Sequence, residues 1–165
     1  MPNYWMLVCF TENFLVTRER GFTMQGFSAN QRRKVRLMQH GDRLLYYLSD
    51  AQAFPATATG VSGYREDHTP VWVGRNPRED YPLRVDIRPE VVLKEGQWVD
   101  ARQLGPSLEY VRKWPPEQWP LAFLEELHLL SQRDFYLLEE ETRKISAKAG
   151  ANPVGPPGAR PPPSR

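Results

Sequence analysis

A serine followed by a basic run is the first part of the sequence whose residue types could bind a ligand. The segment "GFSANQRRKVRLMQHGD" spans residues 26–42. Ser28 and Gln31 have the spacing of a capping box, and Gly41 is a typical helix stop, so the sequence predicts a helix over residues 29–39. Free amides and the helix dipole at such an N-terminus favour anions.

Charge supports an anionic partner for this segment. Residues 12–43 contain seven Lys or Arg against three Asp or Glu, although the whole chain carries a net charge of only +2. We therefore expect Arg32, Arg33 and Arg36 to bind phosphate. The alternative is that they form an ordinary solvated helix face.

The residues that most often carry catalysis or metals are sparse. Cys9 is the only cysteine, and its apolar neighbours indicate a small buried residue and not a nucleophile. His40, His68 and His128 are scattered, so no metal site and no cofactor are expected. Asp42 follows Gly41 at a helix-to-strand turn, where a structural role is favoured over a catalytic one.

The elements that must position these residues are mostly strands. Alternating or β-branched runs predict strands at residues 4–10, 43–49, 56–64 and 83–93, with Pro89 interrupting the last. The segment "FLEELHLLS" at 123–131 fits a helix or a strand equally well. A helix over 131–144 is clearer, because Ser131 and Asp134 form an N-terminal cap and Phe135 and Leu138 share a face.

Two adjacent rings near the start of the chain need separate explanations. In a strand, neighbouring side chains point to opposite faces, so Tyr4 and Trp5 cannot both enter one core. One of the two rings is therefore expected outside the core.

Length and composition fit one domain with an appendage. We expect a globular domain over residues 1–143 and a disordered Pro/Gly/Ala-rich tail over 144–165, because the tail has little apolar surface to bury. No stretch reaches the roughly 20 apolar residues that span a membrane. A cytoplasmic monomer is the expectation.

The order of the motifs resembles the EVE domain. "NYWMLV", the basic segment, "LLYYLS" and "ATATGVSGY" follow one another as in that family, over residues 3–141. The resemblance implies an α+β fold, the PUA-like curled mixed β-barrel with flanking helices, related to YTH and ASCH domains. It also implies a non-catalytic reader that holds a modified nucleobase in an aromatic pocket.

The family pattern implies which residues form that pocket. It places Trp5 on the first strand, Gly26, Phe27 and Ser28 in the loop before the basic helix, and Tyr47 and Ser49 on the following strand. Trp114 and Trp119, within "KWPPEQWP", either close the pocket or cover one end of the barrel. Core packing is the alternative for Trp5 and Tyr47, and helix capping is the alternative for Ser28.

The sequence therefore predicts a module that binds nucleic acid with a modified base, with a 5-substituted cytosine in DNA favoured. Flat rings suit a base that has left its stack, and a few fixed polar groups suit its edge. A general RNA-binding PUA-like module is one alternative, because a basic helix also suits A-form backbones. A small nuclease or nucleobase-processing enzyme is the other; it needs a general base, for which Asp42 is the candidate.

Overall fold

The fold is built on one curled mixed sheet. The structure is a computed structural model that describes residues 1–74 and 76–151. Within these residues eight strands form a sheet of order β2-β6-β5-β3-β1-β8, with the short β4 beside β3 and β7 beside β4. The strands are β1 (Tyr4–Cys9), β2 (Met24–Phe27), β3 (Arg43–Leu48), β4 (Ala53–Phe54), β5 (Ala56–Glu66), β6 (Leu83–Val92), β7 (Val99–Asp100) and β8 (Leu127–Leu130).

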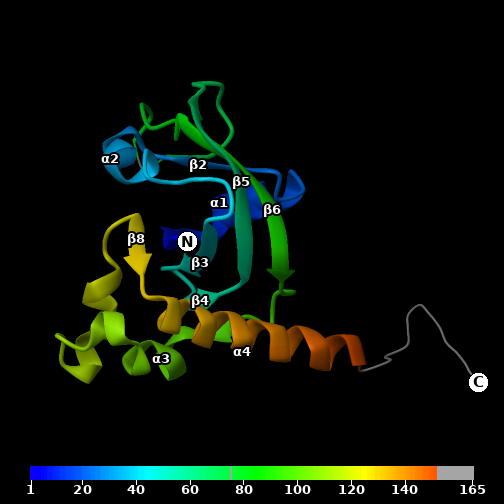
Figure 1. Cartoon of the computed structure of the whole chain (residues 1–165), viewed down its shortest axis with the longest axis vertical. Coiled ribbons are helices and arrows are strands. Elements are labelled where there is room, and N and C mark those ends of the chain that lie inside the picture. The colour runs from blue at the N-terminus through cyan, green and yellow to red at the C-terminus, as the bar shows by residue number, and fades with distance from the viewer. Residues whose placement is uncertain (75, 152–165) are drawn as a thin grey trace, which may run out of the picture.

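Helical segments cover both faces of the sheet. Figure 1 shows α3 and α4 along its lower side and α2 at the opposite end. The α-helices are α1 (Thr11–Glu19), α2 (Arg32–Val35), α3 (Ala101–Leu104) and α4 (Gln132–Ala151), and the 3-10 segments are η1 (Ala29–Gln31), η2 (Gly105–Ser107), η3 (Glu109–Val111) and η4 (Pro116–Phe123). The predicted α+β fold class and the four predicted strands are confirmed.

The parallel pair β1 and β3 explains why neighbouring rings are both buried. The two strands pair in parallel from Tyr4 beside Arg43 to Cys9 beside Leu48. Parallel strands are commonly covered on both faces, so side chains on both faces are apolar. Tyr4 packs in a core with Phe135 of α4, while Trp5 packs in a second core with Phe14 of α1. Each ring therefore has its own core.

The chain differs from expectation at Pro89, where the strand continues. Ala58 faces Pro89, but Thr57 faces Val91, so the pairing shifts by one residue at a β-bulge. Proline cannot donate to the ladder, and a bulge lets the strand pass it. The ambiguous segment before residue 131 forms strand β8 at the edge of the sheet.

Helix α4 begins as predicted but ends later. The Ser131 hydroxyl accepts a hydrogen bond from the Asp134 amide (3.1 Å), and Phe135 and Leu138 are buried together, as expected. The helix continues to Ala151, so the predicted start of the tail at Lys144 is wrong for residues 144–151. The rest of the predicted tail, residues 152–165, lies outside the described residues.

The basic segment forms a shorter helix than predicted. In place of one helix over 29–39, the 3-10 turn η1 is followed by the four-residue α2. The Ser28 side chain does not cap either element, because its hydroxyl bonds to a carboxylate far along the chain. The predicted capping box at Ser28 is wrong, and with it the argument from a long helix dipole.

Replacing Trp5 with Phe should lower the free energy of unfolding by about 2 kcal/mol or more, because the buried Asp42 carboxylate loses a charge-assisted hydrogen bond. The indole nitrogen of Trp5 lies 3.0 Å from Asp42 Oδ2. Urea denaturation measures the change. Trp114→Phe is the control, since the half-buried Trp114 indole has no hydrogen-bond partner among the described residues. Equal losses in both variants would show that the Trp5 bond contributes little.

Candidate functional site

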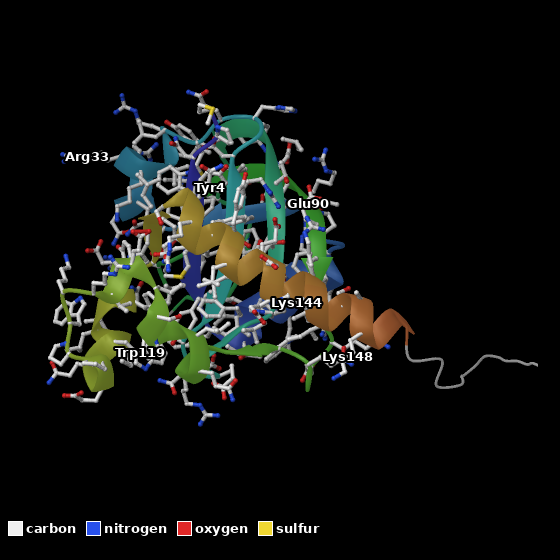
Figure 2. All side chains as sticks on the ribbon, turned by 60° about the horizontal axis from the view of Figure 1, so that its bottom comes forward. Tyr4, Arg33, Glu90, Trp119, Lys144 and Lys148 are labelled. Atoms are coloured by element: carbon white, nitrogen blue, oxygen red, sulfur yellow. The ribbon has the colours of Figure 1, made fainter. Side chains whose placement is uncertain are left out.

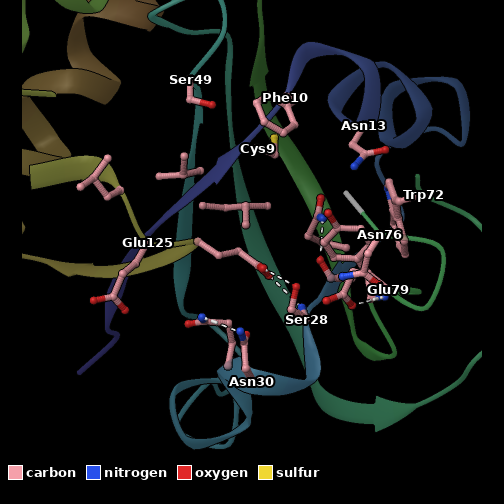
Figure 3. A pocket seen from close by; sticks show the side chains of 18 residues that line it. Cys9, Phe10, Asn13, Ser28, Asn30, Ser49, Trp72, Asn76, Glu79 and Glu125 are labelled. Carbon is pink, nitrogen blue, oxygen red and sulfur yellow. Dashed lines mark hydrogen bonds between the residues drawn. The ribbon is translucent and has the colours of Figure 1, made fainter. Parts of the chain in front are cut away.

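A cavity of about 460 Å³ lies between several segments of the chain. It is lined by residues 7–10 of β1 and the turn after it, by parts of 25–31, by the loop between β5 and β6, and by residues 124–126. Figure 3 shows Trp72, Asn76 and Glu79 on one side, with Ser28 and Asn30 at one end and Phe10 and Ser49 toward the other. Phe10, Trp72 and Tyr81 are the aromatic residues of the lining, and Trp72 is 6% exposed.

Trp72 forms one wall, and helix α1 holds it in place. Its indole nitrogen donates to the Thr17 hydroxyl at 2.9 Å. The neighbouring Val73 is clamped by the Asn13 side chain, which accepts from the Val73 amide and donates to its carbonyl, both at 2.8 Å. Three hydrogen bonds therefore fix the ring and its backbone against α1.

Arg84 secures the same wall from behind. Its side chain is 1% exposed, and its guanidinium lies 5.2 Å from the centre of the Trp72 ring. It donates to the carbonyl oxygens of Thr69 (2.5 Å), Asp80 (3.1 Å) and Tyr81 (3.1 Å). Burial lowers the pKa of this guanidinium. Because a buried cation needs partners, Arg84 ties the two ends of the loop together.

Gly26 allows this loop to approach strand β2. A Cβ added there would lie 2.7 Å from the Tyr81 carbonyl oxygen and closer still to the Trp72 ring. Only a residue without a side chain fits the space, so Gly26 is required by close approach and not by its backbone angles.

Ser28 and Glu126 form a polar contact within the cavity. The Ser28 amide donates to Glu126 Oε2 (2.8 Å) and its hydroxyl donates to Oε1 (2.5 Å). Burial raises the pKa of the Glu126 carboxyl, and the hydrogen bonds from Ser28 oppose that shift. The sheet fixes the position of Glu126, because its carbonyl accepts from the Val8 amide at 2.7 Å.

Some of the residues expected in the pocket line this cavity, and others do not. Gly26, Ser28 and Ser49 line the cavity. The expectation that Trp5 and Tyr47 enter it is wrong, because each is 2% exposed and packed in a core. Phe27 is likewise a core residue.

Tyr47 and Trp119 belong to the core on the α4 side of the sheet. Tyr47 packs against Phe54 and Phe123 with ring centres 5.2 and 5.0 Å apart, and burial raises its pKa to about 12. Trp119 contacts Phe123 and covers Gly105, so it closes one end of the core. Trp114 is half-buried and does not line the cavity.

The three arginines of the basic segment differ in their surroundings. Arg32 pairs with Glu66 at 3.0 Å. Arg33 and Arg36 are exposed, and no acid within the described ranges lies at ion-pair distance from either. Figure 2 shows Arg33 well apart from Lys144 and Lys148. Arg33 and Arg36 follow Asn30 and Gln31, which line the cavity.

The residues considered for chemistry have other roles. Asp42 is buried and accepts from the Trp5 indole, the Asn3 amide and the Gln39 amide, which confirms its structural role. Cys9 is partly buried: it packs against the core that contains Trp5 and also lines the cavity, and burial raises the pKa of its thiol. Among residues 1–74 and 76–151, no group of three or more His, Cys, Asp or Glu could hold a metal ion. No helix in the same ranges is long and apolar enough to cross a membrane.

Two residues that shape the cavity were missed by sequence reasoning. Trp72 stands in "HTPVWVGRNPRED", and a large ring in a Pro- and Gly-rich loop was a usable signal, because functional side chains concentrate in such loops. Glu126 gave no comparable signal, since it lies in the segment that fitted a helix or a strand.

Known proteins similar to this chain show which fold it has. No family model matches the chain. A UPF0310 protein of Pyrococcus abyssi is 25% identical over 148 residues, which cover 83% of this chain and 97% of that protein.

Solved structures are similar over most of the chain at low identity. The YTH domain of Mmi1 in complex with RNA has a TM-score of 0.64 at 8% identity, covering 90% of this chain and 87% of that one. A hypothetical protein from Leishmania major has a TM-score of 0.53 at 16% identity, covering 87% and 97%. A Pseudomonas syringae protein has a TM-score of 0.56 at 12% identity, covering 83% and 97%. The chain therefore has the YTH/PUA-like α+β fold.

Gly26→Ala should lower the free energy of unfolding by about 1 to 3 kcal/mol, because the added methyl group overpacks against the Trp72 wall. Gly63→Ala is the matched control, since a Cβ there meets nothing within 4 Å. Chemical denaturation gives both values, and hydrogen exchange of residues 67–82 should rise only in Gly26→Ala. Similar behaviour of the two variants would contradict the close approach of this loop to β2.

Proposed function

We propose that this protein is a non-catalytic nucleic-acid-binding module that takes one modified nucleobase into the cavity beside Trp72. DNA carrying a 5-substituted cytosine is the favoured ligand, and RNA is the alternative. The observation that carries the proposal is a cavity of about 460 Å³, large enough to admit a base, with Trp72 in one wall and the Ser28–Glu126 contact within it.

The composition of the cavity suits a base that has left its stack. Binding pockets of about 300 to 1,000 Å³ commonly join apolar walls with a few fixed polar groups. Here Phe10, Trp72 and Tyr81 offer ring surface, while Ser28 and Asn30 offer polar atoms. Stacking on one ring contributes about 1 to 3 kcal/mol, and extrusion from a duplex costs a few kcal/mol. A single pocket should therefore bind at micromolar affinity unless phosphate contacts add to it.

The similar proteins give independent support for a nucleic-acid ligand. Mmi1, whose YTH domain shares the fold, was solved in complex with RNA. The motif order resembles EVE domains, for which modified bases are the implied ligands. The Mmi1 complex is the reason for keeping an RNA ligand as the second candidate.

The absence of catalysis, a monomeric state and a cytoplasmic location are further parts of this proposal. The structural role of Asp42 supports a binding function over the enzyme alternative, because its carboxylate is occupied by three donors. A general base needs to reach its target proton, and Asp42 is buried.

Trp72→Leu should weaken binding of a single-stranded oligonucleotide that carries 5-methylcytosine by about tenfold, because leucine fills apolar space but does not stack on a base. Titration calorimetry against DNA and RNA forms measures the affinity, with circular dichroism to verify folding. Trp114→Leu is the control and should bind like the parent. A folded Trp72→Leu protein with unchanged affinity would place the base elsewhere.

Replacing Arg33 and Arg36 together with Gln should reduce the dependence of affinity on salt, by about 0.7 to 0.9 in the log-log slope for each phosphate group that the protein no longer binds. Modified and unmodified strands should weaken by similar factors, since phosphate contacts do not read the base. The control replaces Lys144 and Lys148, an equal change in charge on α4. If both double variants keep the parent slope, Arg33 and Arg36 form only a solvated surface.

A further inference from the structure

We propose that Glu126 selects which bases enter the cavity, by accepting a hydrogen bond from an exocyclic amine. Cytosine-type and adenine-type bases carry that amine, whereas thymine and hypoxanthine carry a carbonyl oxygen at the same place. This inference rests on the proposed function, and it adds the chemical group that is read and the residue that reads it.

Two elements fix the position of the Glu126 carboxylate. Its backbone lies directly before β8, where the Val8 amide donates to its carbonyl at 2.7 Å. Its two carboxylate oxygens both accept from Ser28, one from the amide and one from the hydroxyl. The side chain is therefore held before any ligand arrives, and a preorganised acceptor costs less ordering on binding.

Ser28 leaves part of the carboxylate's hydrogen-bonding capacity unused. Each carboxylate oxygen can accept about two hydrogen bonds, and the described residues supply one to each. Glu126 lines the cavity, so a ligand is placed to supply a further donor. Hydrogen bonds to a carboxylate are stronger than those between neutral groups, which makes this contact a strong discriminator.

The other two carboxylates of the cavity are less suited to this role. Glu79 is held less firmly, because it accepts one hydrogen bond, from the Tyr81 amide at 3.0 Å, whereas Glu126 accepts two from Ser28. The Glu125 side chain is 71% exposed and pairs with Lys34 at 3.4 Å. Glu126 lies deeper, and burial is the largest cause of its raised pKa.

An ionised carboxylate penalises a carbonyl as well as rewarding an amine. It is an acceptor only, so a keto oxygen at the same position meets like partial charge and receives no hydrogen bond from it. Unpaired buried acceptors are costly, and a charge-assisted bond contributes about 1.5 to 3 kcal/mol, which corresponds to a preference of roughly tenfold or more.

The test compares four short single-stranded oligonucleotides that differ only in the central base: 5-methylcytosine, thymine, adenine and hypoxanthine. 5-Methylcytosine and thymine share the methyl group, and adenine and hypoxanthine share the purine frame, so each pair differs at the amine or carbonyl and the adjacent ring nitrogen. Fluorescence anisotropy should show the amine member of each pair binding about tenfold or more tightly in the parent protein. In Glu126→Gln, whose side chain has nearly the same shape, the preference should disappear.

Glu125→Gln is the matched control, because it makes the same change in charge on the adjacent exposed residue. It should keep the parent preference. Equal binding within each pair by the parent protein, or a preference for the keto members, would overturn the role of Glu126 even if Glu126→Gln failed to fold. Retention of the preference by a folded Glu126→Gln protein would also overturn it.

The outcomes separate this inference from the proposed function. Binding of both members of each pair with equal affinity, abolished in Trp72→Leu, would leave the base-binding function intact and overturn the selection by Glu126. Failure of the parent to bind any of the four strands in DNA or RNA form would overturn the proposed function, and the inference with it.

Discussion

Burial of the sheet on both faces is the constraint on which the rest of the structure depends. Because β1 and β3 pair in parallel, their side chains fill a core on either side. Neither Trp5 nor Tyr47 is left over for a ligand, and Trp5 also anchors the turn before β3 through Asp42. The cavity is lined mostly by the segments that join the strands, together with parts of β1 and β2.

The loop between β5 and β6 supplies one wall of the cavity, and hydrogen bonds to α1 and β6 hold it in place. The Trp72 indole donates a hydrogen bond to Thr17, and the amide of the next residue donates to the Asn13 side chain. Arg84 donates to backbone carbonyl oxygens at both ends of the loop. Such support limits the conformational entropy that a ligand would have to remove. The buried cation and the close approach at Gly26 thus fix the shape of the cavity wall.

The fold was more predictable from sequence than the site, for physical reasons. Alternation along "LRVDIR" and the apolar run after Tyr4 are local signals, and the structure has strands there. The cavity depends on contacts between distant residues, such as Ser28 with Glu126, which no local pattern reveals. Ser28 and Gly26 were found through family resemblance. Trp5 was expected in the pocket because the alternation of side chains along a strand shows that Tyr4 and Trp5 point to opposite faces. It does not show that a core covers each face.

We propose that a base binds at the Trp72 wall and not at the rings of the first strand. The indole N–H signals of the five tryptophans, assigned by single Trp→Phe variants, can be followed by nuclear magnetic resonance while an oligonucleotide with 5-methylcytosine is added. If the base binds at the Trp72 wall, the Trp72 signal should shift with saturation while the Trp5 and Trp119 signals stay in place. A shift of the Trp5 or Trp119 signal with an unmoved Trp72 signal would contradict it.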